Sequence, residues 1–295
     1  MKQEPPCEEP DLTRAHAVAV DAARAAGALM RRNLRSPKRI QAATQHDLKI
    51  ELDVRCQALI ERTLRAAFPR TAILGEEGTV GDPEAPDRWV VDPIDGTVNF
   101  AYGIPHACVS IALQRRGGGG AGGARPRDAA PGRREETADY ETTLGVVYDP
   151  FCDELWTATC RGRSRLNGRI IQVSNRRHLA ETIITIGFAK RRSSLQQVLP
   201  VVNRLMHRVR KLRVMGAAAL DLAYVASGRM DAYLEPGVRL WDIAAGGLIL
   251  ERAGGDFWRE PVRGAPAHTY RIMASNGRLR AQLAPLVRLF RLPSS

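Results

Sequence analysis

One stretch constrains the fold of this chain more than any other: residues 89–100, which read Trp-Val-Val-Asp-Pro-Ile-Asp-Gly-Thr-Val-Asn-Phe. The β-branched valines after the tryptophan predict a buried strand. Pro93 has no N–H to donate to a strand ladder, so we expect the strand to end at Asp92. A tight turn that opens a helix should follow. Two carboxylates, Asp92 and Asp95, are therefore expected at a strand end, beside a hydroxyl and free backbone N–H groups.

These groups suit a divalent cation and a phosphate. Neighbouring carboxylates repel one another unless positive charge lies between them, and Mg²⁺ takes oxygen ligands. Free N–H groups at the start of a helix bind anions. The alternative is a capped helix that follows a strand and binds nothing. Two further acidic segments favour the metal site. Glu76 and Glu77 follow a second apolar run, and Asp242 begins an apolar helical pattern, where an acid also caps the helix.

Three motifs resemble the signature motifs of the inositol monophosphatase family, which are Mg²⁺-dependent, lithium-sensitive phosphomonoesterases. They are Glu76-Glu77, Asp92-Pro-Ile-Asp95-Gly-Thr97 and Trp241-Asp242-Ile-Ala-Ala-Gly246, in the family's order and at compatible spacing. The resemblance runs from the first predicted helix to the last. It implies a mixed α+β and α/β fold, the layered αβαβα sandwich of this family, together with lithium inhibition and a homodimer.

The resemblance also implies a metal site with two or three Mg²⁺ ions. Its ligands would be Glu76, Asp92, the carbonyl of Ile94, Asp95 and Asp242. Glu77 would support these ligands without binding metal itself. Two cations about 4 Å apart activate a water and stabilise the leaving oxygen of an in-line displacement.

By the same resemblance, the catalytic residues are Thr97, Asp53 and Glu76. Asp53 would accept a hydrogen bond from the Thr97 hydroxyl, which orients the nucleophilic water. Asp53 also suits the cap of its own helix, and both roles remain open.

Substrate contacts are implied in two regions. The N–H groups of Gly96 and Thr97 would bind the phosphate at a helix start. Residues 216–219 resemble the family's turn beside the substrate, although the family usually has Ser or Thr where this chain has Ala217. The full predicted substrate set is Gly96, Thr97, Gly216, Ala217, Ala218, Glu235 and Asp242, with Glu235 as the acceptor of a substrate hydroxyl.

The net charge of +12 raises a hypothesis of another class, a basic RNA- or protein-binding module that keeps the fold. Arginines are spread along the whole chain, and aromatic residues make up only 5% of it. We therefore expect any nucleic-acid binding to be weak and non-specific. A basic field would also attract an anionic phosphoester.

The 295 residues suit one large domain or two close halves. Residues 1–10 predict a disordered lead without a secretory signal. Residues 11–150 predict an α+β half with most metal ligands, and residues 151–295 an α/β half that completes the site. Within the first half, the Gly- and Arg-rich residues 115–141 predict a low-complexity insertion in a hairpin loop.

Composition also predicts the compartment. No apolar run reaches the roughly 20 residues that a membrane span needs. The five cysteines are scattered without CxxC spacing, which indicates free thiols in a reducing cytoplasm.

We therefore predict an enzyme that hydrolyses a phosphate monoester of a polyol or sugar with Mg²⁺ and a metal-activated water. Inositol monophosphate is the first candidate substrate. Fructose 1,6-bisphosphate, histidinol phosphate and 3′(2′),5′-bisphosphate nucleotides remain open, because these relatives share the metal site.

Overall fold

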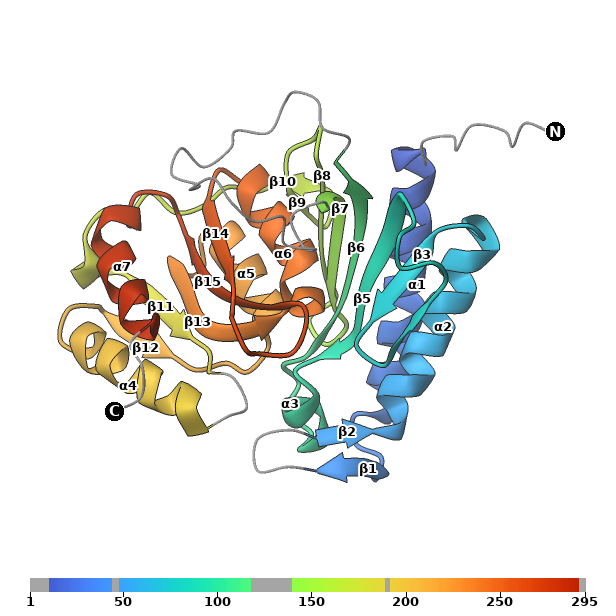
Figure 1. Cartoon of the computed structure of the whole chain (residues 1–295), viewed down its shortest axis with the longest axis horizontal. Helices are drawn as coiled ribbons and strands as arrows, with labels where there is room; N and C mark the ends of the chain where they lie inside the picture. The colour runs from blue at the N-terminus through green and yellow to red at the C-terminus, as the bar shows by residue number, and fades with distance from the viewer. Residues whose placement is uncertain (1–10, 44–47, 118–139, 189–191, 292–295) are drawn as a thin grey trace.

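The computed structural model describes residues 11–43, 48–117, 140–188 and 192–291. Helical layers alternate with two β-sheets across the molecule (Figure 1). The outer helices beside the first sheet are α1 (Leu12–Asn33) and α2 (Glu51–Ala67), the central pair is α5 (Ala218–Ala226) and α6 (Leu240–Arg252), and the outer helices beside the second sheet are α4 (Arg192–Met206) and α7 (Arg280–Val287). The predicted layered αβαβα sandwich is confirmed.

The first sheet of the described chain comprises β3 (Ala72–Gly75), β4 (Gly78–Val80), β5 (Asp87–Asp95), β6 (Cys108–Arg116), β7 (Tyr140–Asp149), β8 (Glu154–Thr159), β9 (Arg165–Leu166) and β10 (Arg169–Ile170). Their spatial order is β10-β9-β8-β7-β6-β5-β3-β4. Neighbours run antiparallel except β3 and β5, which are parallel. The carboxyl ends of β3 and β5 therefore meet at one edge.

The second sheet comprises β11 (Ile183–Ile186), β12 (Lys211–Arg213), β13 (Ala232–Arg239), β14 (Asp256–Pro261) and β15 (Thr269–Ser275), in the order β12-β11-β13-β15-β14. Strand β11 is parallel to both of its neighbours, and the remaining pairs are antiparallel. The smaller elements are the hairpin β1 (Ile40–Ala43) with β2 (Leu48–Ile50), the short helix α3 (Thr97–Ala101), and 3₁₀ turns at Leu179–Glu181 and Arg288–Arg291.

Pro93 does not end strand β5, contrary to the prediction. The strand continues to Asp95, and its pairing with β6 shifts register between Asp92 and Asp95. A bulge tolerates proline because its extra residue leaves the hydrogen-bonded ladder. Side chains three residues apart in a regular strand point to opposite faces. The shift therefore lets Asp92 and Asp95 face the same side.

The central helices are buried on nearly every side. Helix α5 is apolar apart from Asp221 and Tyr224, as expected for a helix between two sheets, and Leu220, Leu222 and Val225 are fully buried. Helix α6 comes close to strand β7, where Gly145 leaves room for the backbone of Ala245. The Ser110 hydroxyl donates to the carbonyl oxygen of Trp241 at 3.0 Å. These contacts fix the first turn of α6 against the first sheet.

The limits of the predicted insertion need correction. Strands β6 and β7 still pair at Arg115 with Glu141 and at Arg116 with Tyr140, so both ends of the predicted segment are strand. Residues 118–139 of that segment, and the predicted lead at 1–10, lie outside the described residues. Among the helices that the structure describes, none combines the length and apolar character needed to cross a bilayer.

Adding a methyl group at Gly145 should push α6 away from the first sheet. A Cβ there would lie 2.6 Å from the carbonyl oxygen of Ala245 and 3.1 Å from its Cα. We expect Gly145→Ala to lower the free energy of unfolding by about 1–3 kcal/mol, the usual cost of overpacking, in urea denaturation. The matched control is Glu141→Ala, an exposed position on the same strand. Equal stability of Gly145→Ala and wild type would show that this contact does not limit the packing.

Candidate active site

Three carboxylates from two separate segments meet at the edge of the first sheet. Asp92, Asp95 and Asp242 each offer one oxygen, and these atoms lie within 4.8 Å of one another. Asp92 and Asp95 end strand β5, and Asp242 lies in the first turn of α6. Glu76 follows the parallel strand β3, and its N–H donates to the carbonyl oxygen of Val91 at 3.1 Å. The sheet thus brings all four predicted acidic ligands to one edge.

A cavity of about 310 Å³ opens over these carboxylates. Most of the predicted site residues line it: Glu76, Asp92, Ile94, Asp95, Gly96, Thr97, Gly216, Ala217, Ala218, Glu235 and Asp242. Asp53 and Glu77 lie outside this lining. The N–H of Glu77 donates to the Gln57 side chain at 2.9 Å, which ties the end of β3 to helix α2.

Burial and mutual repulsion shape the electrostatics of the cluster. Asp92 is 1% exposed, and burial raises its pKa well above the ordinary value, with further contributions from Glu76, Asp242 and Asp95. The pKa of Asp95 is raised to about 7, first by burial and then by Asp242. Both carboxyl groups would be easier to ionise with a cation between them.

Backbone N–H groups partly offset the effect of burial and repulsion on the Asp95 carboxylate. Its two carboxylate oxygens accept from the N–H of Ala218 at 3.2 Å and of Ala219 at 2.7 Å, in the first turn of α5. These bonds lower the pKa of Asp95 against the effect of burial. The N–H of Ala218, which we predicted beside the substrate, therefore holds a carboxylate of the protein.

The turn after β5 requires a glycine. Gly96 has φ +88°, and a Cβ there would lie 2.9 Å from the carbonyl oxygen of His106. Helix α3 starts at the next residue, as predicted, although it is only one turn long. The Thr97 hydroxyl donates its single proton to the carbonyl oxygen of Ile94 at 2.9 Å. The predicted bond from Thr97 to Asp53 is thus not the one that this structure forms.

Asp53 lies in the first turn of α2 and is 3% exposed. Its Oδ2 accepts from the N–H of Ile50 at 2.9 Å, so it caps the helix, as one of the two predicted roles requires. Its role beside the catalytic hydroxyl stays a prediction.

Sequence reasoning missed Asn99, which joins the two halves of the site. Its side-chain amide donates to the carbonyl oxygens of His106 at 3.0 Å and Met215 at 2.8 Å. The second of these immediately precedes Gly216, so Asn99 fixes the predicted substrate turn against α3. Only the position of Asn99, two residues after Thr97, hinted at a role.

A group of hydrogen-bond acceptors lines the same cavity as the carboxylate cluster. Glu235, on β13, accepts a short hydrogen bond from the Tyr233 hydroxyl. Asp221 is 2% exposed and accepts from the Thr185 hydroxyl at 3.0 Å, and burial raises its pKa well above the ordinary value. A Cβ at Gly187 would collide with the Glu235 carboxylate in its present position, so a larger residue there would displace this side chain.

The residues present fit divalent metal. Converging carboxylate oxygens are the ligands of hard cations such as Mg²⁺, and the mutual repulsion that helps to raise the pKa values of Asp92 and Asp95 would be relieved by such a cation. Asp92, Asp95 and Asp242 could each give one oxygen to an ion, and Glu76 and the Ile94 carbonyl lie in the same cavity.

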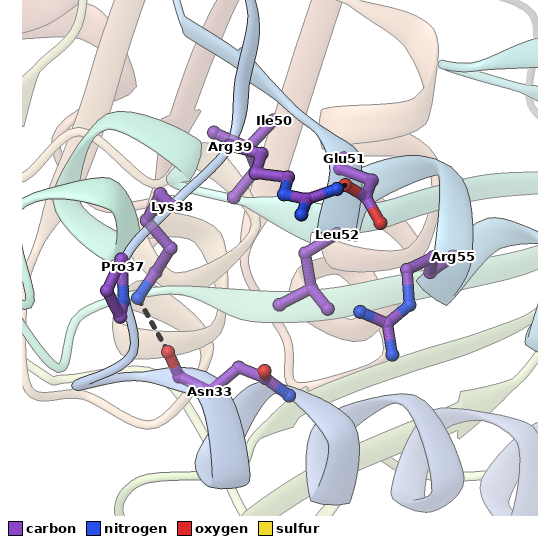
Figure 2. Close-up of a pocket in the computed structure, with 8 residues that line it drawn as sticks. All are labelled: Asn33, Pro37, Lys38, Arg39, Ile50, Glu51, Leu52 and Arg55. Carbon is purple, nitrogen blue, oxygen red and sulfur yellow. Dashed lines mark hydrogen bonds and ion pairs between the residues drawn. The ribbon is translucent and has the colours of Figure 1, made fainter.

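A second cavity, of about 330 Å³, lies between the end of α1 and the first turn of α2 (Figure 2). It is basic. Lys38 donates to the carbonyl oxygen of Asn33 at 2.6 Å, and Arg39 lies 3.7 Å from Glu51. The side chain of Arg55 also lines this cavity. It shares no lining residue with the carboxylate cavity.

The geometry can be compared with known proteins. The sequence matches the Inositol monophosphatase family over residues 11–123 and 137–289. The chain belongs to this family. The gap between the two matched ranges falls inside the predicted insertion. Membership supports phosphatase activity and a metal-dependent site, and leaves the exact substrate open.

Relatives of the inositol monophosphatase family carry two kinds of name. The Nus factor SuhB of Xylella fastidiosa is 38% identical over 242 residues, covering 81% of this chain and 79% of that protein. Inositol monophosphatase 1 of Solanum lycopersicum is 33% identical over 279 residues, covering 92% and 94%. The solved structure of the inositol monophosphatase from Anabaena (Nostoc) sp. PCC 7120 superimposes with a TM-score of 0.75 at 32% identity, covering 96% and 97%.

Removing one buried carboxylate should change how stability depends on pH in the metal-free protein. The pKa of Asp95 rises from 3.8 to about 7 on folding, so between these values the folded state binds more protons than the unfolded chain. Its free energy of unfolding must then fall as pH rises through this window. We expect a smaller fall in Asp95→Asn, measured by urea denaturation in chelator from about pH 4 to about pH 7.

The matched control is Asp21→Asn, an exposed carboxylate on α1, which should follow the wild-type curve. Any pH-independent cost of the new amide at position 95 shifts the whole curve and leaves its slope untouched. Parallel curves for wild type and Asp95→Asn would contradict a raised pKa at this position.

Proposed function

We propose that this chain is a Mg²⁺-dependent phosphatase that hydrolyses a phosphate monoester of a polyol or sugar, with inositol monophosphate as the first candidate. The observation that carries the proposal is the convergence of Asp92, Asp95 and Asp242 within 4.8 Å in a cavity of about 310 Å³. Family membership supports the reaction class. The acceptors Asp221 and Glu235, which line the same cavity, support an alcohol that carries hydroxyl groups.

Each part of the cavity has a task in this mechanism. Glu76, Asp92, Asp95, Asp242 and the Ile94 carbonyl would hold the ions. Bound Mg²⁺ would supply positive charge against the phosphate oxygens and lower the pKa of a water.

The turn after β5 would bind the phosphate and the attacking water, and Glu235 would bind the alcohol. The N–H groups of Gly96 and Thr97, at the start of α3, would orient the phosphate. The Thr97 hydroxyl would hold the attacking water, with Asp53 behind it and Glu77 supporting the end of β3. For this task the hydroxyl must give up its present bond to the Ile94 carbonyl. Glu235 would accept a hydrogen bond from the alcohol.

The alternatives from the sequence stay open within this proposal. Fructose 1,6-bisphosphate, histidinol phosphate and 3′(2′),5′-bisphosphate nucleotides all present a phosphate to such a site. We also propose lithium sensitivity, two or three Mg²⁺ ions, a homodimer, a cytoplasmic location, and the two-half organisation with its boundary at residue 150.

A second candidate function is a basic RNA- or protein-binding module. Two observations favour keeping it: relatives named Nus factor SuhB, and the basic cavity with Lys38, Arg39 and Arg55. The complete carboxylate cluster favours catalysis, since a binding module has no need of it. If the wild type releases no phosphate and Asp92→Asn keeps wild-type affinity for an RNA oligonucleotide, the second function is supported.

Phosphate release from a panel of monophosphates tests the first proposal. We expect wild type to release phosphate only with Mg²⁺. In Asp95→Asn the rate of release should fall more than about a hundredfold, because loss of even a residue that supports a metal ligand lowers activity ten- to hundredfold. Asp21→Asn should keep full activity. Mg²⁺ should also raise the melting temperature of wild type and not of Asp95→Asn. No release from any ester, with either form, would overturn the assignment.

A further inference from the structure

The basic cavity of about 330 Å³ between the end of α1 and the start of α2 has no task in the mechanism above (Figure 2). Lys38 and Arg39 come to it from the chain between α1 and β1, and Arg55 comes from α2. Glu51 is the one carboxylate among the described residues that line it. Three cations beside one carboxylate repel one another unless further negative charge is bound between them. The cavity therefore suits an anion.

Lys38 gives the cavity a positive charge in a fixed position. Its ammonium donates to the carbonyl oxygens of Asn33, Leu34 and Ser36 at 2.6, 2.8 and 2.7 Å, at the end of α1. It also lies 4.7 Å from the centre of the Phe100 ring on α3. The three carbonyl contacts use all three hydrogens of the ammonium. Lys38 therefore contributes its charge to the cavity, and the hydrogen bonds to an anion must come from other groups.

The two arginines keep donors for a ligand. The carbonyl oxygen of Arg39 accepts from the N–H of Glu51 at 3.0 Å, which holds this residue beside α2. The guanidinium of Arg39 lies 3.7 Å from the Glu51 carboxylate, beyond hydrogen-bond distance, and the Arg39 side chain is 88% exposed. Such an exposed pair adds little to stability, so Arg39 is able to turn toward a ligand.

Arg55 lies one turn further along α2 than Glu51. No hydrogen bond or ion pair joins its guanidinium to another residue of the described chain. A guanidinium presents five N–H donors in a planar fork, which matches two oxygens of a phosphate. Two such groups at one cavity favour a phosphate over an anion with a single acceptor atom.

The first turn of α2 adds positive potential to the same cavity. Ile50 and Leu52 line it, and the helix is 17 residues long. The aligned peptide dipoles of a helix favour an anion at its N-terminus. Ile50, the N-cap residue, has no side-chain oxygen that could accept from the N–H groups of this turn. A ligand in the cavity would thus meet positive potential from the helix as well as from three side chains.

We propose that this basic cavity is a binding site for a phosphate group, which Arg39 and Arg55 hold through their guanidinium groups and which Lys38 attracts by its charge. The site needs no metal, and it takes the phosphate as a bound ligand and not as a substrate. Its volume is at the lower end of the roughly 300–1,000 Å³ that small-molecule sites occupy, so inorganic phosphate and the phosphate end of a small ester both fit.

Titration calorimetry on the full chain tests the site. Metal is first removed on a chelating resin, so that the acidic carboxylate cavity repels the probes and no ester is hydrolysed. The probes are inorganic phosphate and glycerol 2-phosphate at low ionic strength. The test variant is Arg39→Gln/Arg55→Gln. The matched control is Arg62→Gln/Arg65→Gln, which changes the net charge equally at two exposed positions of α2 that do not line the cavity.

We expect wild type to bind phosphate at one saturable site and the test variant to bind it about tenfold more weakly, because two charge-assisted donors are lost. The control should keep the wild-type affinity. Tighter binding of glycerol 2-phosphate than of inorganic phosphate identifies the ligand as a phosphate monoester, and the reverse order identifies it as free phosphate. No saturable binding to wild type, or affinities that do not differ between the two variants, would overturn the proposal.

This test is independent of the proposed phosphatase activity. A chain that hydrolyses no ester can still bind phosphate in the basic cavity, and an active Mg²⁺-dependent enzyme can fail to bind it without metal. Both variants should melt near the wild-type temperature in the absence of phosphate, because exposed arginines contribute little to stability. Matching melting curves ensure that a loss of affinity reports on the cavity and not on unfolding.

Discussion

Repulsion among buried carboxylates is the constraint on which the rest of this structure depends. Asp92 and Asp95 are 1% and 7% exposed, and Asp242 offers an oxygen within 4.8 Å of both. Burial alone penalises such charges, and their proximity adds to the penalty. Packing elsewhere in the fold must stabilise the structure enough to keep these carboxylates together. Their arrangement is therefore better explained by a bound cation than by stability.

The sandwich supplies that packing through its central helices. Helix α5 gives Asp95 two backbone N–H donors, and helix α6 carries Asp242 at its first turn. Both helices are buried between the sheets, so neither can move without disturbing two interfaces. The close approach of Gly145 to Ala245 and the bond from Ser110 to the Trp241 carbonyl hold α6 in place. Side chains that repel are thus held on elements that cannot separate.

The net charge of the chain and the charge of the carboxylate cavity have opposite signs. The whole chain carries +12, while the charged residues in the described lining of the carboxylate cavity are all acidic. A basic surface attracts phosphoesters from a distance, and an acidic cavity attracts cations. Both are needed by a site in which metal ions mediate between carboxylates and a phosphate.

Much of this could be predicted from the sequence alone. The apolar run before Glu76 placed that acid at the end of a strand, and local turn chemistry placed Gly96 and a helix start after Asp95, although the strand end predicted at Asp92 was wrong. These features depend on neighbouring residues, so they can be read from a single segment. The layered fold followed from the order of the motifs and their resemblance to a family.

Tertiary structure decided the rest, because it depends on segments far apart in the chain. The bulge that carries β5 through Pro93 needs the pairing with β6. The Thr97 hydroxyl has several acceptors within reach, and only the folded turn selects the Ile94 carbonyl. Asn99 joins α3 to a turn 116 residues away, and the carboxylate cavity is lined by residues from segments as distant as Glu76 and Asp242. The sequence by itself determined which chemical groups the candidate site offers, and packing decided which of them face one another.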